Sequence, residues 1–150
     1  MKFENTIFIA APRSVVWDVT IDVEGWPQWA PTFSSVKRLD DGPFDVGSSA
    51  LIKQPGLPAA KWVVTSLTRG ERFSWESRIQ GIHMVGTHEL TTQHTGTHSM
   101  LRVELRGLVA FLLWPVICIA VKRSLERENA GLKARCEAIG LRFGTVRRDH

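Results

Sequence analysis

The sequence predicts a single α+β domain over residues 1–150, in which an antiparallel sheet of about seven strands packs against one long helix near the C-terminus. Segments of alternating apolar and polar residues, bounded by glycine and proline, recur from residue 3 to residue 106. Two of the turns between them are short enough for tight hairpins. After these segments, apolar residues recur at steps of three and four, which is typical of an amphipathic helix.

The N-terminal part predicts one strand and two short helices. Residues 3–10 are rich in β-branched and aromatic types and are followed by a proline. A short helix is expected at 12–21, and the segment 22–31 allows one more helical turn, which contains Trp26 and Trp29. The next predicted strands cover 33–40, 47–53 and 61–68.

The last three strands can be paired by arithmetic. With residues 80–81 as a two-residue loop, Phe73 faces His88, and with residues 95–96 as a second loop, His88 faces Val103. Both registers gather the apolar side chains on one face of the sheet, and a slip of one residue would mix the faces. For the strand before them, the loop length leaves the direction of Trp62 open.

The closing helix is expected over 115–139, with Gly140 as a stop signal. Cys118 and Cys136 then lie roughly 27 Å apart at 1.5 Å per residue, too far for a disulfide. Free thiols, and an N-terminus without the apolar stretch of a signal peptide, favour the cytoplasm.

The formal net charge of +4 arises in the C-terminal part, since residues 122–150 carry 8 basic and 4 acidic side chains. Most of them alternate in sign at helical spacing, Glu128 among them, as on a solvated helix face. Only the basic residues of segment 142–150 are left as a possible electrostatic contact. We therefore expect no nucleic-acid partner.

The longest apolar run, Leu108–Val121, has 14 residues and is interrupted by Pro115. It falls short of the ~20 residues that cross a bilayer. Its apolar side chains also lie on sides of the helix that the buried stripe does not use, which indicates a partner surface. Three explanations stay open: a homodimer contact, burial against the loop at 55–58, and transient docking to a membrane.

Two motifs carry a resemblance to a known family. They are IAAPRSVVWDV at 9–19 and DVEGWPQWAP at 22–31, supported by shorter matches. These shorter matches are Val46-Gly47, Phe73-Ser74-Trp75, Gly96-Thr97 and Leu132-Lys133. The chain resembles the START/birch-pollen-allergen (SRPBCC) superfamily of helix-grip proteins, and within it the polyketide cyclase/dehydrase-like group. The resemblance implies a bent sheet wrapped around the long helix, with a cavity between them for lipids, sterols, polyketides or aromatic compounds.

The residues expected to line this cavity come from the apolar face of the strands, the short helical turn and the long helix. They are Trp26, Trp29, Phe73, Trp75, Met84, His88, Leu90, Leu101, Val103, Cys118, Val121, Leu125 and Asn129. Each apolar member is either core or cavity wall. His88 is the foremost candidate for a ligand contact, against a hydrogen-bonded core histidine. Asn129 contacts a ligand or caps the sheet, and the two tryptophans of the turn border the opening or seal the core.

Catalytic motifs are absent from the sequence: it has no G-x-S-x-G, no phosphate-binding glycine loop and no H-E-x-x-H. We expect no metal and no cofactor. The sequence favours binding or transport of a hydrophobic small molecule. The alternative is a polyketide cyclase or dehydratase that uses His88 as its proton donor or acceptor, and a third hypothesis is a subunit with a collapsed cavity that acts through the Leu108–Val121 surface.

Overall fold

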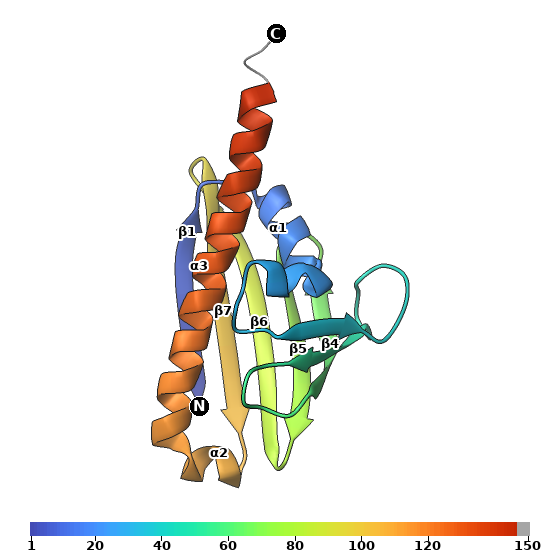
Figure 1. Cartoon of the computed structure of the whole chain (residues 1–150), viewed down its shortest axis with the longest axis vertical. Coiled ribbons are helices and arrows are strands. Elements are labelled where there is room, and N and C mark those ends of the chain that lie inside the picture. The colour runs from blue at the N-terminus through green and yellow to red at the C-terminus, as the bar shows by residue number, and fades with distance from the viewer. Residues whose placement is uncertain (147–150) are drawn as a thin grey trace.

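The computed structural model describes the backbone of residues 1–146 and the side chains of residues 1–141. It contains one seven-stranded antiparallel sheet in the order β1-β7-β6-β5-β4-β3-β2 (Figure 1). The elements are β1 (Lys2–Ile9), α1 (Arg13–Ile21), the 3-10 helix η1 (Val23–Gln28), β2 (Ser35–Arg38), β3 (Ser49–Lys53), β4 (Ala60–Thr68), β5 (Arg72–Ile79), β6 (Ile82–Gln93), β7 (Gly96–Arg106), α2 (Leu108–Leu112) and α3 (Trp114–Val146). The predicted α+β class, with two short helices after the first strand, is confirmed.

Helix α3 runs along the sheet (Figure 1). Its residues Leu125, Leu132 and Cys136 are buried. At 33 residues it is longer than the predicted 115–139. Gly140 does not end it, because this residue keeps a helical backbone and faces open space. A glycine inside a helix costs about 1 kcal/mol relative to alanine. The helix continues through Gly140 despite this cost. Both cysteines are free thiols, as predicted.

The hairpin between β5 and β6 has the predicted register, with Phe73 opposite His88. The register between β6 and β7 differs by two residues from the prediction. Gln93 pairs with Gly96, the loop is residues 94–95, and His88 faces Leu101 rather than Val103. A shift of two preserves the face on which every side chain lies, so the separation of apolar and polar faces could not detect it.

The connection from β4 to β5 decides where Trp62 points. Thr68 pairs with Arg72 across a three-residue loop, and the register shifts between Val64 and Ser66 at a β-bulge. Trp62 lies on the same face as Trp75, with 5.5 Å between the ring centroids. Its side chain therefore faces the interior between sheet and helix.

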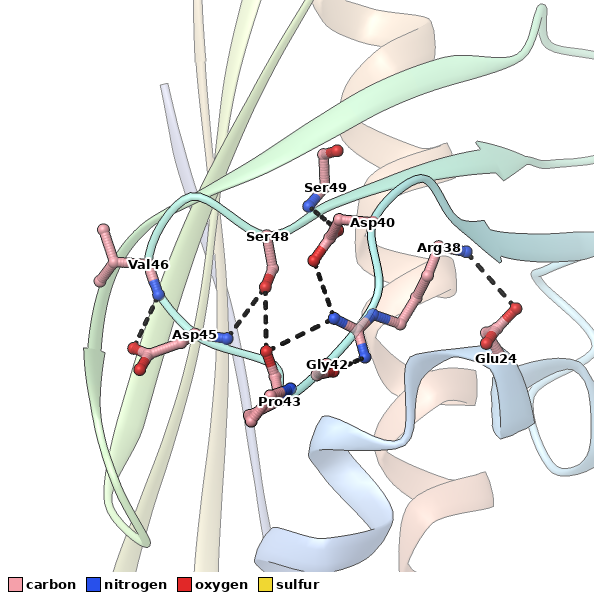
Figure 2. A network of polar contacts seen from close by, with 9 residues as sticks. All are labelled: Glu24, Arg38, Asp40, Gly42, Pro43, Asp45, Val46, Ser48 and Ser49. Atoms are coloured by element: carbon pink, nitrogen blue, oxygen red, sulfur yellow. Dashed lines mark hydrogen bonds and ion pairs between the residues drawn. The ribbon is translucent and has the colours of Figure 1, made fainter.

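The segment between β2 and β3 is fixed by a polar network (Figure 2). The Asp40 carboxylate accepts hydrogen bonds from the Ser49 amide at 2.8 Å and from the Arg38 guanidinium at 2.9 Å. The Ser49 hydrogen bond, together with those of its other partners, lowers the pKa of Asp40. The segment so held directs Phe44 into the core, where its ring centroid lies 5.2 Å from that of Phe73.

The apolar run Leu108–Val121 forms α2 and the first two turns of α3, at one end of the molecule (Figure 1). Most of its large side chains are exposed. Burial against the loop at 55–58 is therefore wrong, since Leu57 of that loop is itself exposed. Among the described residues, no helix is both long enough and apolar enough to cross a membrane. The basic residues at 142–150 have side chains outside the described part.

Candidate functional site

A cavity of about 170 Å³ lies between the inner face of the sheet and α3. Its lining comprises Trp26, Phe33, Ile52, Gln54, Leu57, Trp62, Trp75, Met84, Gly86, Thr87, His88, Leu101, Arg102, Val103, Leu105, Val121, Ser124, Leu125 and Glu128. An apolar cavity of about 150 Å³ holds a molecule of the size of benzene. Leu57 lines the cavity and is 54% exposed, so the cavity reaches the surface beside this residue.

Three indole rings make the aromatic wall of the cavity. Trp75 lies in the middle, with ring centroids 5.3 Å from Trp26 and 5.5 Å from Trp62. Gly86 makes room for them, because a Cβ atom there would lie 3.0 Å from the Trp75 Nε1 and 3.4 Å from the Trp62 ring. The Trp26 indole N–H donates to the Thr20 carbonyl at 3.0 Å, which fixes that ring.

His88 is buried in the aromatic wall. Its imidazole stacks on Phe73 at 4.6 Å and lies 5.2 Å from the ring of Trp26. Burial lowers its pKa to about 3, so the ring is neutral at neutral pH. Its ring nitrogens make no hydrogen bond to any described residue. A hydrogen-bonded core histidine, one of the two predicted roles, is therefore not what the structure has.

Glu128 was not predicted as a site residue, and its assignment to a solvated helix face is wrong. It is buried on the side of α3 that faces the cavity, and burial raises its pKa to about 8. Its carboxyl group has no hydrogen-bond partner within the described part of the chain. A signal was present in the sequence, because residue 128 continues the spacing of Val121, Leu125 and Leu132 on the buried stripe. The mixed charges around it concealed that spacing.

The cavity brings together eight of the thirteen predicted residues: Trp26, Trp75, Met84, His88, Leu101, Val103, Val121 and Leu125. The other five, Trp29, Phe73, Leu90, Cys118 and Asn129, do not line it. Phe73 lies behind the imidazole of His88, in contact with Trp17. Cys118 packs beside Val121 in the apolar cluster next to the cavity.

Asn129 and Trp29 have structural contacts instead. The Asn129 amide donates to the Asn5 carbonyl at 3.0 Å and accepts from the Ser99 hydroxyl at 3.0 Å, so it caps the sheet. Trp29 is half-buried where the chain after η1 meets α3. A Cβ atom on Gly131 would lie 2.0 Å from the Trp29 carbonyl oxygen, so the approach of the two backbones requires glycine there.

Comparison with known proteins gives one family match and many structural ones. A family model described as polyketide cyclase / dehydrase and lipid transport matches residues 1–137. A protein of Streptomyces halstedii, provisionally named a polyketide cyclase, is 49% identical over 37 residues, which are 25% of this chain. The match spans only 34% of the length of that curated relative.

Solved structures of similar shape cover nearly the whole chain. A START superfamily protein of Mycobacterium smegmatis has a TM-score of 0.74 at 15% identity, over 92% of this chain and 98% of that one. A protein of Thermus thermophilus has a TM-score of 0.73 at 17% identity, over 93% and 99%. The di-domain ARO/CYC protein of the steffimycin biosynthetic pathway has a TM-score of 0.73 at 13% identity, and the match covers 93% of this chain and 51% of that one. These likenesses confirm the predicted helix-grip fold.

Proposed function

Because the chain belongs to the polyketide cyclase / dehydrase and lipid transport family, we propose that it binds a small hydrophobic molecule between its sheet and α3. The family membership confirms the resemblance found in the two tryptophan-containing motifs. Function still follows from the site, since one fold serves many activities.

The observation that carries the proposal is a pair of polar side chains, His88 and Glu128, that line a mainly apolar cavity and have no hydrogen-bond partner among the described residues. A buried polar group favours a hydrogen-bond partner, and the polar ends of His88 and Glu128 are open to a ligand or water in the cavity that they line. At neutral pH one offers a nitrogen acceptor and the other a carboxyl proton. The ligand that fits is neutral, with an aromatic or alicyclic body and at least one hydroxyl or carbonyl group.

The size of the cavity restricts the ligand further. A volume of about 170 Å³ suits a compact ring system, and is below the roughly 300–1,000 Å³ of sites for drug-sized molecules. A longer lipid or polyketide would place only one end inside and extend past Leu57 to the surface.

A cyclase-like or dehydratase-like reaction is the second candidate, favoured by the same two groups. A protonated carboxyl and a neutral imidazole in one cavity form a proton donor and a proton acceptor. The two functions differ in the product: a carrier returns its ligand unchanged, whereas an enzyme converts it with a pH dependence that His88→Phe abolishes.

The test uses Ser124, a small residue of α3 that lines the cavity. The neutral fluorophore N-phenyl-1-naphthylamine has three aromatic rings, so it would place one ring system inside the cavity and extend past Leu57, and its titration should give saturable binding to the wild type. Ser124→Phe should weaken that binding at least about tenfold by filling the cavity, whereas the control Ser124→Ala should preserve it. Equal binding to both variants would remove the cavity as the site. Native mass spectrometry of freshly purified protein then identifies the natural ligand.

We also propose that the protein is one domain over residues 1–150 and resides in the cytoplasm. The free thiols of Cys118 and Cys136 support a reducing location. Imaging of the protein with a fluorescent tag tests the cytoplasmic location.

A further inference from the structure

Helix α2 and the start of α3 form an exposed apolar surface, which we name the apolar corner. Its members are Leu108, Phe111, Leu112, Leu113, Trp114, Val116 and Ile119. Leu108, Phe111 and Val116 are each 72% exposed, a degree rarely seen for several neighbouring large apolar side chains. The apolar corner lies at the extremity of the long axis of the molecule, where the chain turns from β7 into α3 (Figure 1).

The apolar corner is held in a defined shape. Gly107 has a φ of +118°, and a Cβ atom there would lie 2.2 Å from the Gly81 carbonyl oxygen, so only glycine makes this turn. Trp114 stacks on Phe3 of β1, with 5.5 Å between the ring centroids. The exposed side chains therefore project from a fixed base at the end of the sheet.

The charges that border the apolar corner are mainly basic. Residues 107–121 contain no charged side chain, and the run is bounded by Arg106 on one side and by Lys122 and Arg123 on the other. All three are exposed. Glu104 is the nearest acidic residue along β7, and it is shared between Lys2 at 3.4 Å and Arg106 at 3.8 Å. Further along α3, Glu126 is the next exposed acidic residue.

We propose that the apolar corner docks onto the surface of an anionic lipid bilayer. Exposed leucine, phenylalanine and tryptophan side chains insert at the boundary between headgroups and acyl chains, and a basic border adds attraction to anionic lipid. In a twofold dimer through the same surface, the basic borders of the two copies would meet and repel each other. The charge distribution therefore favours a bilayer over a second copy.

Docking would bring the cavity close to the membrane. Leu105, Val121 and Met84 line the cavity and belong to the apolar cluster that also contains Ala110 of α2. This end of the cavity and the buried base of α2 thus belong to one apolar cluster. The docking inference itself does not depend on what the cavity holds.

Co-sedimentation with two kinds of vesicle tests the proposal, one of phosphatidylcholine alone and one with added phosphatidylserine. The wild type should bind the anionic vesicles and bind the neutral ones at least about tenfold more weakly. Raising the salt to about 1 M, where the Debye length is near 3 Å, should weaken binding to the anionic vesicles. No sedimentation with anionic vesicles would overturn the proposal.

Two variants separate the apolar and basic contributions. Phe111→Ser combined with Val116→Ser should abolish vesicle binding, and Lys122→Gln combined with Arg123→Gln should weaken it about tenfold. The matched control, Leu39→Ser with Val46→Ser, removes two exposed apolar side chains from the β2–β3 connection and should bind as the wild type does. Equal loss in this control would overturn the assignment to the apolar corner.

Two further measurements complete the test. Sedimentation velocity should show a monomer, and a dimer that Phe111→Ser dissociates would assign the surface to a second copy instead. N-phenyl-1-naphthylamine binding without vesicles should be unchanged in the Phe111 and Val116 variant. This separates failure of docking from failure of the proposed cavity function.

Discussion

The imidazole of His88 stacks face to face on the ring of Phe73, with 4.6 Å between the centroids and 10° between the ring planes. The two residues are directly opposite across β5 and β6. Stacking fixes the orientation of the imidazole without using its nitrogen atoms, which are left for the cavity. The same burial disfavours the charged form, so the histidine acts as a neutral hydrogen-bonding group.

Replacing His88 should change how stability depends on pH on the acid side. The folded-state pKa of about 3 lies below the unfolded value of 6.5. Between these values the unfolded state binds more protons, so this residue makes the free energy of unfolding fall as pH decreases, by up to about 1.4 kcal/mol per pH unit. His88→Phe keeps the stacking and should lose this contribution. Urea denaturation of both proteins from pH 6.5 to pH 3 measures it, and a constant difference between them would contradict the assignment.

Glu128 should act in the opposite direction. Its folded-state pKa of about 8 lies above the unfolded value of 4.5. Between these values the folded state binds more protons, so stability falls as pH rises, by up to about 1.4 kcal/mol per pH unit. Glu128→Gln should therefore gain stability relative to the wild type from pH 4.5 to pH 8. Glu126→Gln, an exposed change two residues away, is the control, and an equal gain in both would contradict the prediction.

The fold could be predicted because its main features are periodic. Alternation with period two identified the strands around Phe73 and His88, and steps of three and four identified the helix that buries Leu125. Alternation could not reveal the shift of two residues between β6 and β7, since this shift leaves every side chain on the same face of the sheet. The direction of the Trp62 side chain could not be predicted, because it depends on the bulge in β4 and this bulge depends on tertiary packing.

The candidate site was only partly predictable for a related reason. An apolar pattern locates the interior, but it does not distinguish a side chain that lines a cavity from one that fills the core. Leu101 and Leu90 share the inner face, and only Leu101 reaches the cavity. Asn129 and Glu128 are adjacent and both buried, and the hydrogen bonds to Asn5 and Ser99 that separate their roles arise from β1 and β7, far away in the sequence.

Asn129 should prove important for stability and unimportant for ligand affinity. Its side chain joins α3 to Asn5 of β1 and to Ser99 of β7 through hydrogen bonds of 2.8–3.0 Å. Asn129→Ala leaves the partner groups unpaired in a buried place, which should cost about 3 kcal/mol in the free energy of unfolding. The affinity for N-phenyl-1-naphthylamine should stay within about twofold of the wild type. A stable variant with lost affinity would instead indicate direct contact with the ligand.

Asp40 should control the local order of the segment that directs Phe44 into the core. Its carboxylate accepts the Ser49 amide proton at 2.8 Å, so Asp40→Ala should expose that amide to exchange and speed its exchange with deuterium about tenfold. Acidification should have the same effect in the wild type only below the usual titration range of aspartate, because the Ser49 hydrogen bond and the Arg38 contact lower the pKa of Asp40. Asp41→Ala is the matched control, since this neighbouring carboxylate is exposed and makes no hydrogen bond within the described residues. Unchanged exchange at Ser49 in the Asp40 variant would mean that the strand pairing of β3 holds this segment without the carboxylate.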